Sequence, residues 1–370
     1  MTMNLMKKAF SIIVSVSIIL GTFHANAFRL VDAETKAPLP LASIADRSGN
    51  VVGMTDKSGV IPELQKDRYP ITFNYMGYAS LQILKPVDHD VRMIQQDYEL
   101  PEIVVIPGSR PLLHLTGYMR EITSVLSSSD SVTIFKESIV DFLVPVEKTK
   151  VKGWNKAREL ASKTYVRMSD SSGRDSVSTN HEYEFMLWGN RKGLIPSAAK
   201  IPDIIKGTDA ACDTVMGKYY PKIIWWKNGD VTRWYGDALA NEKDHITSPW
   251  ALKLFGLTTD VTEISENYVF DTPDGDFIRP TDLRQASVTI DMLAKGKLFK
   301  KTFDSSSPVN VRTYMELYLT DREFLSEEEG KSLKKEIPEM ESSDILAPPN
   351  ANPLHPAILR TVERVNSLCL

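Results

Sequence analysis

The sequence contains little cysteine, no excess of positive charge and almost no long apolar runs, and each shortage excludes a class of protein. Two cysteines among 370 residues exclude a disulfide-dense scaffold and a multi-thiolate metal site. Lys and Arg number 44 against 48 Asp and Glu, and this mild acidity argues against a dedicated nucleic-acid-binding protein, which carries a basic surface. Past the first residues no apolar run approaches the ~18 residues of a membrane span. We therefore expect no transmembrane segment in the mature chain.

The first residues have the pattern of an export signal. Two lysines precede an apolar stretch over residues 9–20, which is too short to span a bilayer but suits a signal peptide. An Ala-Asn-Ala cleavage pattern ends at Ala27. We expect a signal peptide over residues 1–27 and a mature chain that starts at Phe28, with an uncleaved anchor as the alternative. The expected location is the periplasm or exterior of a Gram-negative cell, with association to the outer membrane left open.

Apolar runs and turn residues divide the mature chain into two β-rich parts. Over residues 28–106 short apolar or alternating runs are separated by Gly and Asp, which is typical of a small all-β sandwich. Residues 107–111 have the composition of a linker. Residues 112–337 predict a β-rich α+β domain with a few short helices, and residues 338–370 a flexible arm that ends in a helix. The predicted fold class is mainly β.

Within the second part most runs predict strands and a few predict helices. The expected strands cover residues 132–142, 163–168, 177–187, 222–226, 231–235, 268–270, 287–293 and 311–319. The expected helices cover residues 112–126, 202–206, 249–255, 326–336 and 355–368. Ser326 and Glu329 form a capping box for the fourth of these helices, and the lysines that follow suit the negative end of its dipole.

Residues 28–106 contain one series of apolar, aspartate, proline and glycine residues in a characteristic order and spacing. The positions are Leu30, Asp32, Thr35, Pro38, Leu39, Ala42 and Ile44; Thr55, Asp56 and Gly59; Ile71, Phe73, Tyr75, Met76, Gly77 and Tyr78; and Leu100, Glu102, Ile103, Val104 and Val105. In this order and spacing they resemble the carboxypeptidase-regulatory-like (transthyretin-like) domain, which also precedes the plug of many TonB-dependent outer-membrane receptors. The family usually has Gly where Phe28 stands. The resemblance implies a β-sandwich that supports or orients a neighbouring domain and has no chemistry of its own.

Four residues of this module have structural roles that follow from their chemistry. Asp56 can bond the backbone of its own turn, where Gly59 can adopt a positive φ. Gly77 can also adopt a positive φ, so that Tyr78 folds back onto the sandwich.

A TonB-dependent receptor needs a barrel of about 22 strands, and the 264 residues after residue 106 are too few for it. The chain instead resembles short secreted proteins that carry this domain before a region of unassigned activity.

Three short patterns resemble catalytic or metal-binding motifs, and each has a simpler structural explanation. His181 and Glu184 have the spacing of a zinc carboxypeptidase motif, but on an alternating strand they point to opposite faces. Residues 197–200 match Ser-x-x-Lys without the companion motifs of penicillin-binding enzymes. Asp271, Asp274 and Asp276 could gather around calcium, but the EF-hand spacing is not met and a hairpin turn explains them. We predict no catalytic residue, no metal and no cofactor.

All six tryptophans lie between residues 154 and 250. Exposed aromatic rings bind partners at low entropic cost, whereas buried ones would build the second core. Neighbours on a strand face opposite ways, so one of two adjacent tryptophans should point inward. The predicted contact surface consists of Tyr219, Tyr220, Trp225, Trp226, Trp234 and Tyr235.

The two cysteines leave three alternatives open. In an oxidising compartment Cys212 and Cys369 could pair and tie the last helix to the second domain. They could also remain free thiols, or one of them could be catalytic.

Together these features favour a non-enzymatic binding or scaffolding protein. The sandwich would serve as a rigid spacer, and the second domain would contact an envelope protein or a glycan. One alternative is a hydrolase with an unrecognised carboxylate site, for which Glu182, Glu184 and Asp271, Asp274 and Asp276 are the first candidates. Another is an accessory of outer-membrane assembly in which an exposed strand edge pairs with a client.

Overall fold

The protein is mainly β, with two packed β units and only two α-helices among the described residues. The computed structural model describes residues 28–96, 109–179, 184, 186–196, 212–243, 246–247, 257–271, 278–297, 299, 303, 307–338 and 340–368. The expected signal peptide lies outside these ranges. Within them no helix is both long and apolar enough to cross a membrane.

The first unit is a small sandwich of six short strands. One layer is a four-stranded antiparallel sheet in the order β3-β2-β4-β5, and the other is the parallel pair β1-β6. The strands are β1 (Leu30–Asp32), β2 (Ser43–Ala45), β3 (Val51–Met54), β4 (Ile71–Asn74), β5 (Leu81–Ile83) and β6 (Val91–Met93), with a 3-10 turn η1 at Lys66–Arg68. Leu30, Leu39, Ile44 and Phe73 are fully buried between the layers.

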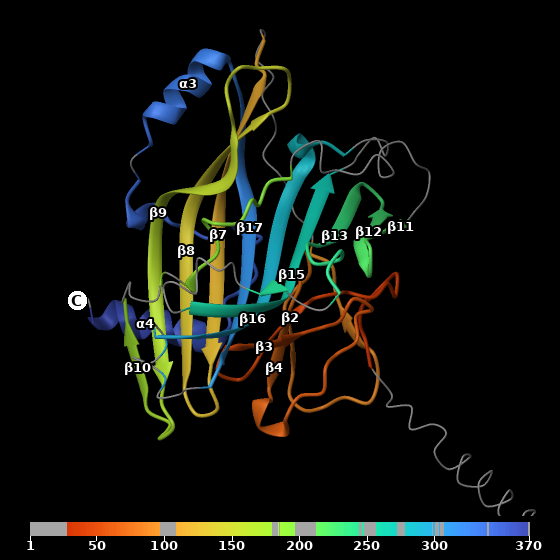
Figure 1. Ribbon diagram of the computed structural model, residues 1–370, viewed down its shortest axis with the longest axis vertical. Coiled ribbons are helices and arrows are strands. Elements are labelled where there is room, and N and C mark those ends of the chain that lie inside the picture. Colours follow the sequence, from red (N-terminus) through yellow and green to blue (C-terminus); the bar gives the residue numbers. More distant parts are fainter. Residues whose placement is uncertain are drawn as a thin grey trace, which may run out of the picture.

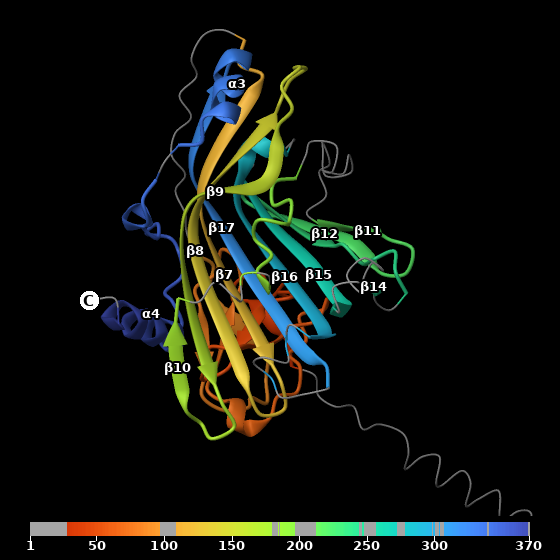
Figure 2. The same ribbon diagram turned by 60° about the vertical axis from the view of Figure 1, so that its left-hand side comes forward.

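The second unit is an eleven-stranded sheet in the order β10-β9-β8-β7-β17-β16-β15-β13-β12-β11, with β14 paired to β15 (Figures 1 and 2). Neighbouring strands are antiparallel throughout, and the last long strand, β17, lies between β7 and β16. The strands are β7 (Leu112–Leu126), β8 (Ser131–Pro145), β9 (Trp154–Ser169), β10 (Asp175–Ser178), β11 (Cys212–Met216), β12 (Pro221–Asn228), β13 (Val231–Asp237), β14 (Ile246–Thr247), β15 (Leu257–Asp271), β16 (Leu283–Gly296) and β17 (Val309–Leu325), with a 3-10 turn η5 at Pro280–Asp282.

The large sheet buries side chains on both faces. One face, here called the apolar face, carries the main hydrophobic cluster, to which β7 contributes Leu113, Leu115 and Met119. The opposite face, here called the sandwich face, is covered by the sandwich near one end of the strands, as Figure 1 shows. Tyr118 and Arg120 of β7 point to this second face and are also buried.

Two helices and an ordered connection complete the chain. α3 (Glu327–Lys335) begins at the predicted capping box of Ser326 and lies at the end of the sheet far from the sandwich (Figure 1). The 3-10 turn η7 (Ser342–Asp344) packs on β9, and α4 (Pro356–Leu368) packs on β9 and β10. Ile345 and Asn352 are buried, so the segment predicted to be a flexible arm is packed against the sheet.

One element differs in type from its prediction. Residues 112–126 were expected to form a helix and instead form β7, whose fifteen residues pair with β8 and β17. Both faces of this strand are covered, so apolar residues occupy neighbouring positions and the alternation that marks a half-buried strand is lost. The predicted strands 132–142, 222–226, 231–235 and 287–293 and the helices 326–336 and 355–368 are confirmed to within a few residues. The predicted strands 163–168, 268–270 and 311–319 are confirmed as parts of the longer strands β9, β15 and β17. Residues 202–206 and 249–255 lie outside the described residues, and of 177–187 the structure gives β10 at its start.

Buried polar contacts join the sandwich to the sheet. The amide of Val51 donates to Ser124 Oγ at 2.9 Å, and Arg233 Nη1 donates to the carbonyl of Met76 at 2.9 Å. Gly77 makes the second contact possible, because a Cβ there would lie 2.8 Å from the guanidinium of Arg233. These contacts fix the orientation of the two units, since a buried polar group that loses its partner costs about 1–3 kcal/mol.

Gly59 provides a test of how closely the first loop packs. Its φ is 75°, and a Cβ would lie 2.8 Å from the carbonyl oxygen of Leu30. Gly173 has a φ of 78° with nothing within 4 Å, so it is a matched control for backbone strain alone. We expect Gly173→Ala to lower the free energy of unfolding by about 1 kcal/mol, and Gly59→Ala by a further 1–3 kcal/mol, roughly, from overpacking. Urea unfolding of both variants measures this, and equal losses would contradict the packing argument.

Candidate functional site

Three of the predicted contact residues belong to the core. Trp225 and Trp234 lie on the apolar face, where Trp234 packs against the rings of Tyr268 at 5.2 Å and Phe270 at 6.3 Å. Tyr235 points to the sandwich face and is fully buried. These three residues are therefore not exposed, as predicted, but buried. Successive side chains of β13 point to opposite faces of the sheet, and both faces are covered here.

The rest of the predicted set remains accessible at one edge of the sheet. Tyr219 and Tyr220 are 43% and 42% exposed in the turn between β11 and β12, and Met216 beside them is 61% exposed. Trp226, which faces away from the buried Trp225, is half-buried. We call Met216, Tyr219, Tyr220 and strand β11 the aromatic edge. Of the strands that the structure describes, β11 is the last on this side of the sheet, and four of its five residues are exposed.

The turn that carries the two tyrosines is held in place. The amides of Tyr219 and Tyr220 donate to the carbonyl of Ala240, and the Tyr220 hydroxyl donates to the carbonyl of Lys243 at 2.8 Å. Lys57 of the sandwich lies 4.4 Å from the centre of the Tyr220 ring, and this cation–π contact joins the sandwich to the aromatic edge. The rings are therefore preorganised, which lowers the entropic cost of binding.

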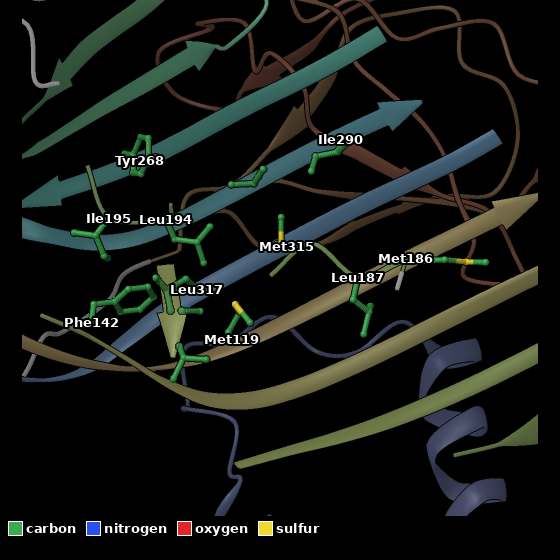
Figure 3. Packing of buried hydrophobic residues seen from close by; sticks show 14 of the residues in the cluster. Met119, Phe142, Met186, Leu187, Leu194, Ile195, Tyr268, Ile290, Met315 and Leu317 are labelled. Carbon is green, nitrogen blue, oxygen red and sulfur yellow. The ribbon is translucent and has the colours of Figure 1, made fainter. Parts of the chain in front are cut away.

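A strap, residues 186–196, crosses the apolar face. Met186, Leu187, Leu194 and Ile195 are buried there among side chains of β7, β8 and β17 (Figure 3). Hydrogen bonds fasten the strap to β9, where the amide of Leu194 donates to the Asn155 carbonyl at 2.8 Å. The strap fills the centre of the apolar face.

Glu121 is the polar anchor of this strap. Its fully buried carboxylate accepts the backbone amides of Trp188 at 2.7 Å and Gly189 at 2.8 Å. Burial raises the pKa of Glu121 above its ordinary value, although these hydrogen bonds act in the opposite direction. Sequence reasoning missed this residue. The sequence signal for it is a charged residue, Glu121, on the same strand face as the apolar Met119 and Val125.

On the sandwich face a buried ion pair lies where sandwich, sheet and C-terminal segment meet. Arg120 pairs with Glu316 and donates through Nη1 to the carbonyl of Asn352 at 2.7 Å. Tyr314 donates to the same carboxylate at 2.9 Å. A cavity of about 20 Å³ beside them has room for about one water molecule. No local sequence pattern marks this pair, because its members are 196 residues apart.

A second polar cluster lies beneath α3. Asp141 is fully buried, with His114 Nε2 at 3.0 Å and Arg158 Nε at 2.7 Å from its oxygens. Burial by itself raises the pKa of Asp141, but the hydrogen bonds from His114 and Arg158 outweigh it and lower that pKa below its ordinary value. Arg158 also donates to the carbonyl of Leu333 at 2.8 Å and stacks on Trp154. The cluster therefore fastens α3 to the sheet.

The turn residues of the sandwich lie where packing requires them. Asp56 Oδ1 accepts the amides of Ser58 and Val60, and Gly59 and Gly77 have positive φ. The hydroxyl of the buried Tyr78 donates a hydrogen bond to Asp32 Oδ2 at 2.7 Å.

The remaining candidates are dispersed or lie outside the described residues. Cys212 is an exposed free thiol on β11, whereas α4 packs at the opposite edge of the sheet; Cys369 lies outside the described residues. Glu184 is exposed, and Asp271 pairs with Arg284. His181, Glu182, residues 197–200, Asp274 and Asp276 are not described. Among the described residues no three His, Cys, Asp or Glu side chains are grouped to hold a metal ion.

The fold defines a mainly β protein in which a small sandwich packs on one face of a large antiparallel sheet. No family model and no curated protein matches the sequence. A solved structure described as "Lipid-protein interactions in lipovitellin" is similar with a TM-score of 0.29 and 10% identity, over 59% of this chain and 26% of that chain. The chain thus spans about a quarter of that protein. This likeness is too low to define a shared fold, and we infer nothing from it.

Removing the Glu121 anchor tests the role of the strap. Glu121→Leu leaves two buried amides without an acceptor, so we expect a loss of about 1–3 kcal/mol in the free energy of unfolding and faster proteolysis within residues 186–196. Glu121→Gln keeps one acceptor oxygen and should lose less. Glu323→Leu, at an exposed position on β17, is the control. Unchanged proteolysis of the strap in Glu121→Leu would show that apolar packing alone holds it.

Proposed function

We propose that this is a non-enzymatic binding or scaffolding protein of the cell envelope that contacts an envelope protein through its aromatic edge. The observation that carries the proposal is the exposure of Met216, Tyr219 and Tyr220 beside a sheet edge to which no described strand is paired. Large rings and methionine are enriched where proteins bind one another. The export pattern of residues 1–27 supports the envelope as the location.

The sandwich acts in this proposal as a brace for the sheet. Its contacts with the sheet are buried, and Lys57 extends from it to Asp237 and to the Tyr220 ring. Such a brace holds the aromatic edge in one orientation relative to the N-terminus of the mature chain. A supporting role of this kind also agrees with the resemblance of residues 28–106 to the carboxypeptidase-regulatory-like domain.

Edge pairing is the mode of contact that the geometry favours. Within the part of the chain that the structure describes, β11 pairs only with β12, so an added strand could pair with its outer edge. The amide of Thr214 on β11 donates to Asp213 Oδ1 at 2.7 Å, and an added strand that used this amide would replace that contact. Pairing would supply affinity, and the neighbouring rings would supply selectivity. An outer-membrane protein in an unfinished state presents unpaired strands of this kind, which supports an assembly accessory as a second candidate. A glycan ligand would instead use the rings alone.

Site-specific crosslinking tests the proposal. A photo-crosslinking amino acid in place of Tyr219 in the full chain should form adducts with envelope proteins in cells. The same amino acid in place of Leu84, which is 74% exposed on the sandwich, is the control and should form few. Equal adducts at both positions would contradict a specific edge.

Ring removal separates the two modes of contact. In Tyr219→Ala/Tyr220→Ala we expect on the order of tenfold weaker binding of the crosslinked partner, because interface aromatics contribute more than 1 kcal/mol each at binding hot spots. Thr214→Pro on the exposed β11 should weaken partner binding by blocking an added strand, while binding of a glycan would be unaffected. A partner bound equally well by all variants would place the contact elsewhere.

A further inference from the structure

Buried oxygen atoms without hydrogen-bond partners gather where the sandwich covers β13, β15 and β16. Glu263 Oε1 and Asp291 Oδ1 are two of them, and the hydroxyls of Tyr235, Ser265 and Thr289 are three more; none has a partner among the described residues. Buried polar groups are almost always paired, so such a cluster requires an explanation.

The strand register places Glu263 and Asp291 directly opposite each other on neighbouring strands. Glu263 of β15 pairs with Asp291 of β16, and both residues follow the alternation that points to the sandwich face. Like charges at such a position repel, and the partly desolvated site strengthens the repulsion. A proton on Glu263 would remove the repulsion and would give this carboxyl group a hydrogen-bond donor for the unpaired oxygens around it.

Charge counting at the interface supports the same conclusion. Three carboxylates face this part of the sandwich: Asp237 from β13, Glu263 from β15 and Asp291 from β16. Two cations approach them, Lys57 from the sandwich and Arg312 from β17, whereas Arg233 of β13 is held at the Met76 carbonyl and over the Tyr78 ring. Lys57 pairs with Asp237, and Arg312 Nε lies 2.8 Å from Asp291 Oδ2. Among the described residues Glu263 is therefore the one of the three carboxylates without an ion pair of its own.

The same groups hold the two units together. Arg312 also donates to the carbonyl of Val52 in β3, and Lys57 crosses from the sandwich to β13. An uncompensated charge at Glu263 therefore acts on contacts that join the sandwich to the sheet. Tyr235 and, from the sandwich, Tyr75 also face the site, and both stay neutral because burial raises the pKa of each hydroxyl.

We propose that the sandwich–sheet interface is a proton-linked joint, closed when Glu263 is protonated and loosened when Glu263 is ionised beside Asp237 and Asp291. This proposal does not depend on the identity of the partner at the aromatic edge.

The direction of the pH dependence follows from burial. Desolvation, and then the charge of Asp237, raises the pKa of Glu263 from 4.5 to about 7. A carboxyl group whose pKa is raised in the closed state stabilises that state fully below pH 4.5, and this contribution is lost as the pH rises through about 7. Opening should thus become more frequent between pH 5 and pH 8, on the order of a hundredfold, because each pKa unit is a factor of ten.

Hydrogen exchange of the intact mature protein measures this opening. We expect exchange of residues 51–57, corrected for the intrinsic effect of pH, to increase on the order of a hundredfold between pH 5 and pH 8. The helix α3, at the far end of the sheet, should show no such increase. Glu263→Gln, which mimics the protonated side chain, should abolish the pH dependence, and Glu323→Gln, at an exposed position on β17, should retain it. The same pH dependence in Glu263→Gln as in the wild type would overturn the proposal.

A second measurement keeps the proposal testable if Glu263→Gln does not fold. The carboxyl carbon of Glu263, followed by NMR in the unmodified protein, should titrate near neutral pH. In Asp291→Asn its midpoint should fall, because the opposing charge is gone. A midpoint near 4.5 for Glu263 in the wild type would refute the proposal.

Discussion

Each long strand of the large sheet has to bury side chains on both of its faces, and most of the structure follows from this constraint. A sheet covered on one face only can place all its polar residues outward. Here the strap and the main hydrophobic cluster occupy the apolar face, and the sandwich, α4 and the C-terminal segment occupy the other. Polar side chains within the strands therefore need partners inside the protein, and many find them as ion pairs or as carboxylate–amide contacts.

The charged residues inside the molecule are of two kinds: those with an ion-pair partner of opposite charge, and those without one. Arg120 with Glu316, and Asp141 with Arg158, are paired within hydrogen-bond distance and fasten neighbouring segments to one another. Such pairs specify an arrangement more than they stabilise it, since desolvation offsets much of their attraction. Glu263 differs because its neighbours include two carboxylates and its nearest cation is already paired. Fixed pairs thus define the geometry of the joint, and one unbalanced carboxylate makes it sensitive to pH.

Much of the fold could be predicted from the sequence, but little of the site could. Alternating runs and the capping box of Ser326 predicted most strands and α3, because these signals are local. Residues 112–126 were misassigned, since burial on both faces removes the alternation that identifies a strand. Trp225 and Trp234 were assigned to a surface because composition does not reveal which face is covered. Arg120, Glu121 and Glu263 act through partners distant in sequence, and no local pattern marks such residues.

The position of β17 has a consequence for the order in which the chain can fold. β7, β8 and β9 follow one another as a meander, but the second edge of β7 is completed only by β17, almost 200 residues later. During synthesis the chain therefore carries an unpaired fifteen-residue edge until residue 325 is available. Long exposed edges of this kind promote aggregation. The sandwich is made first and contacts β7 through Val51 and Ser124, so it is placed to shield part of that edge while the rest of the sheet is made.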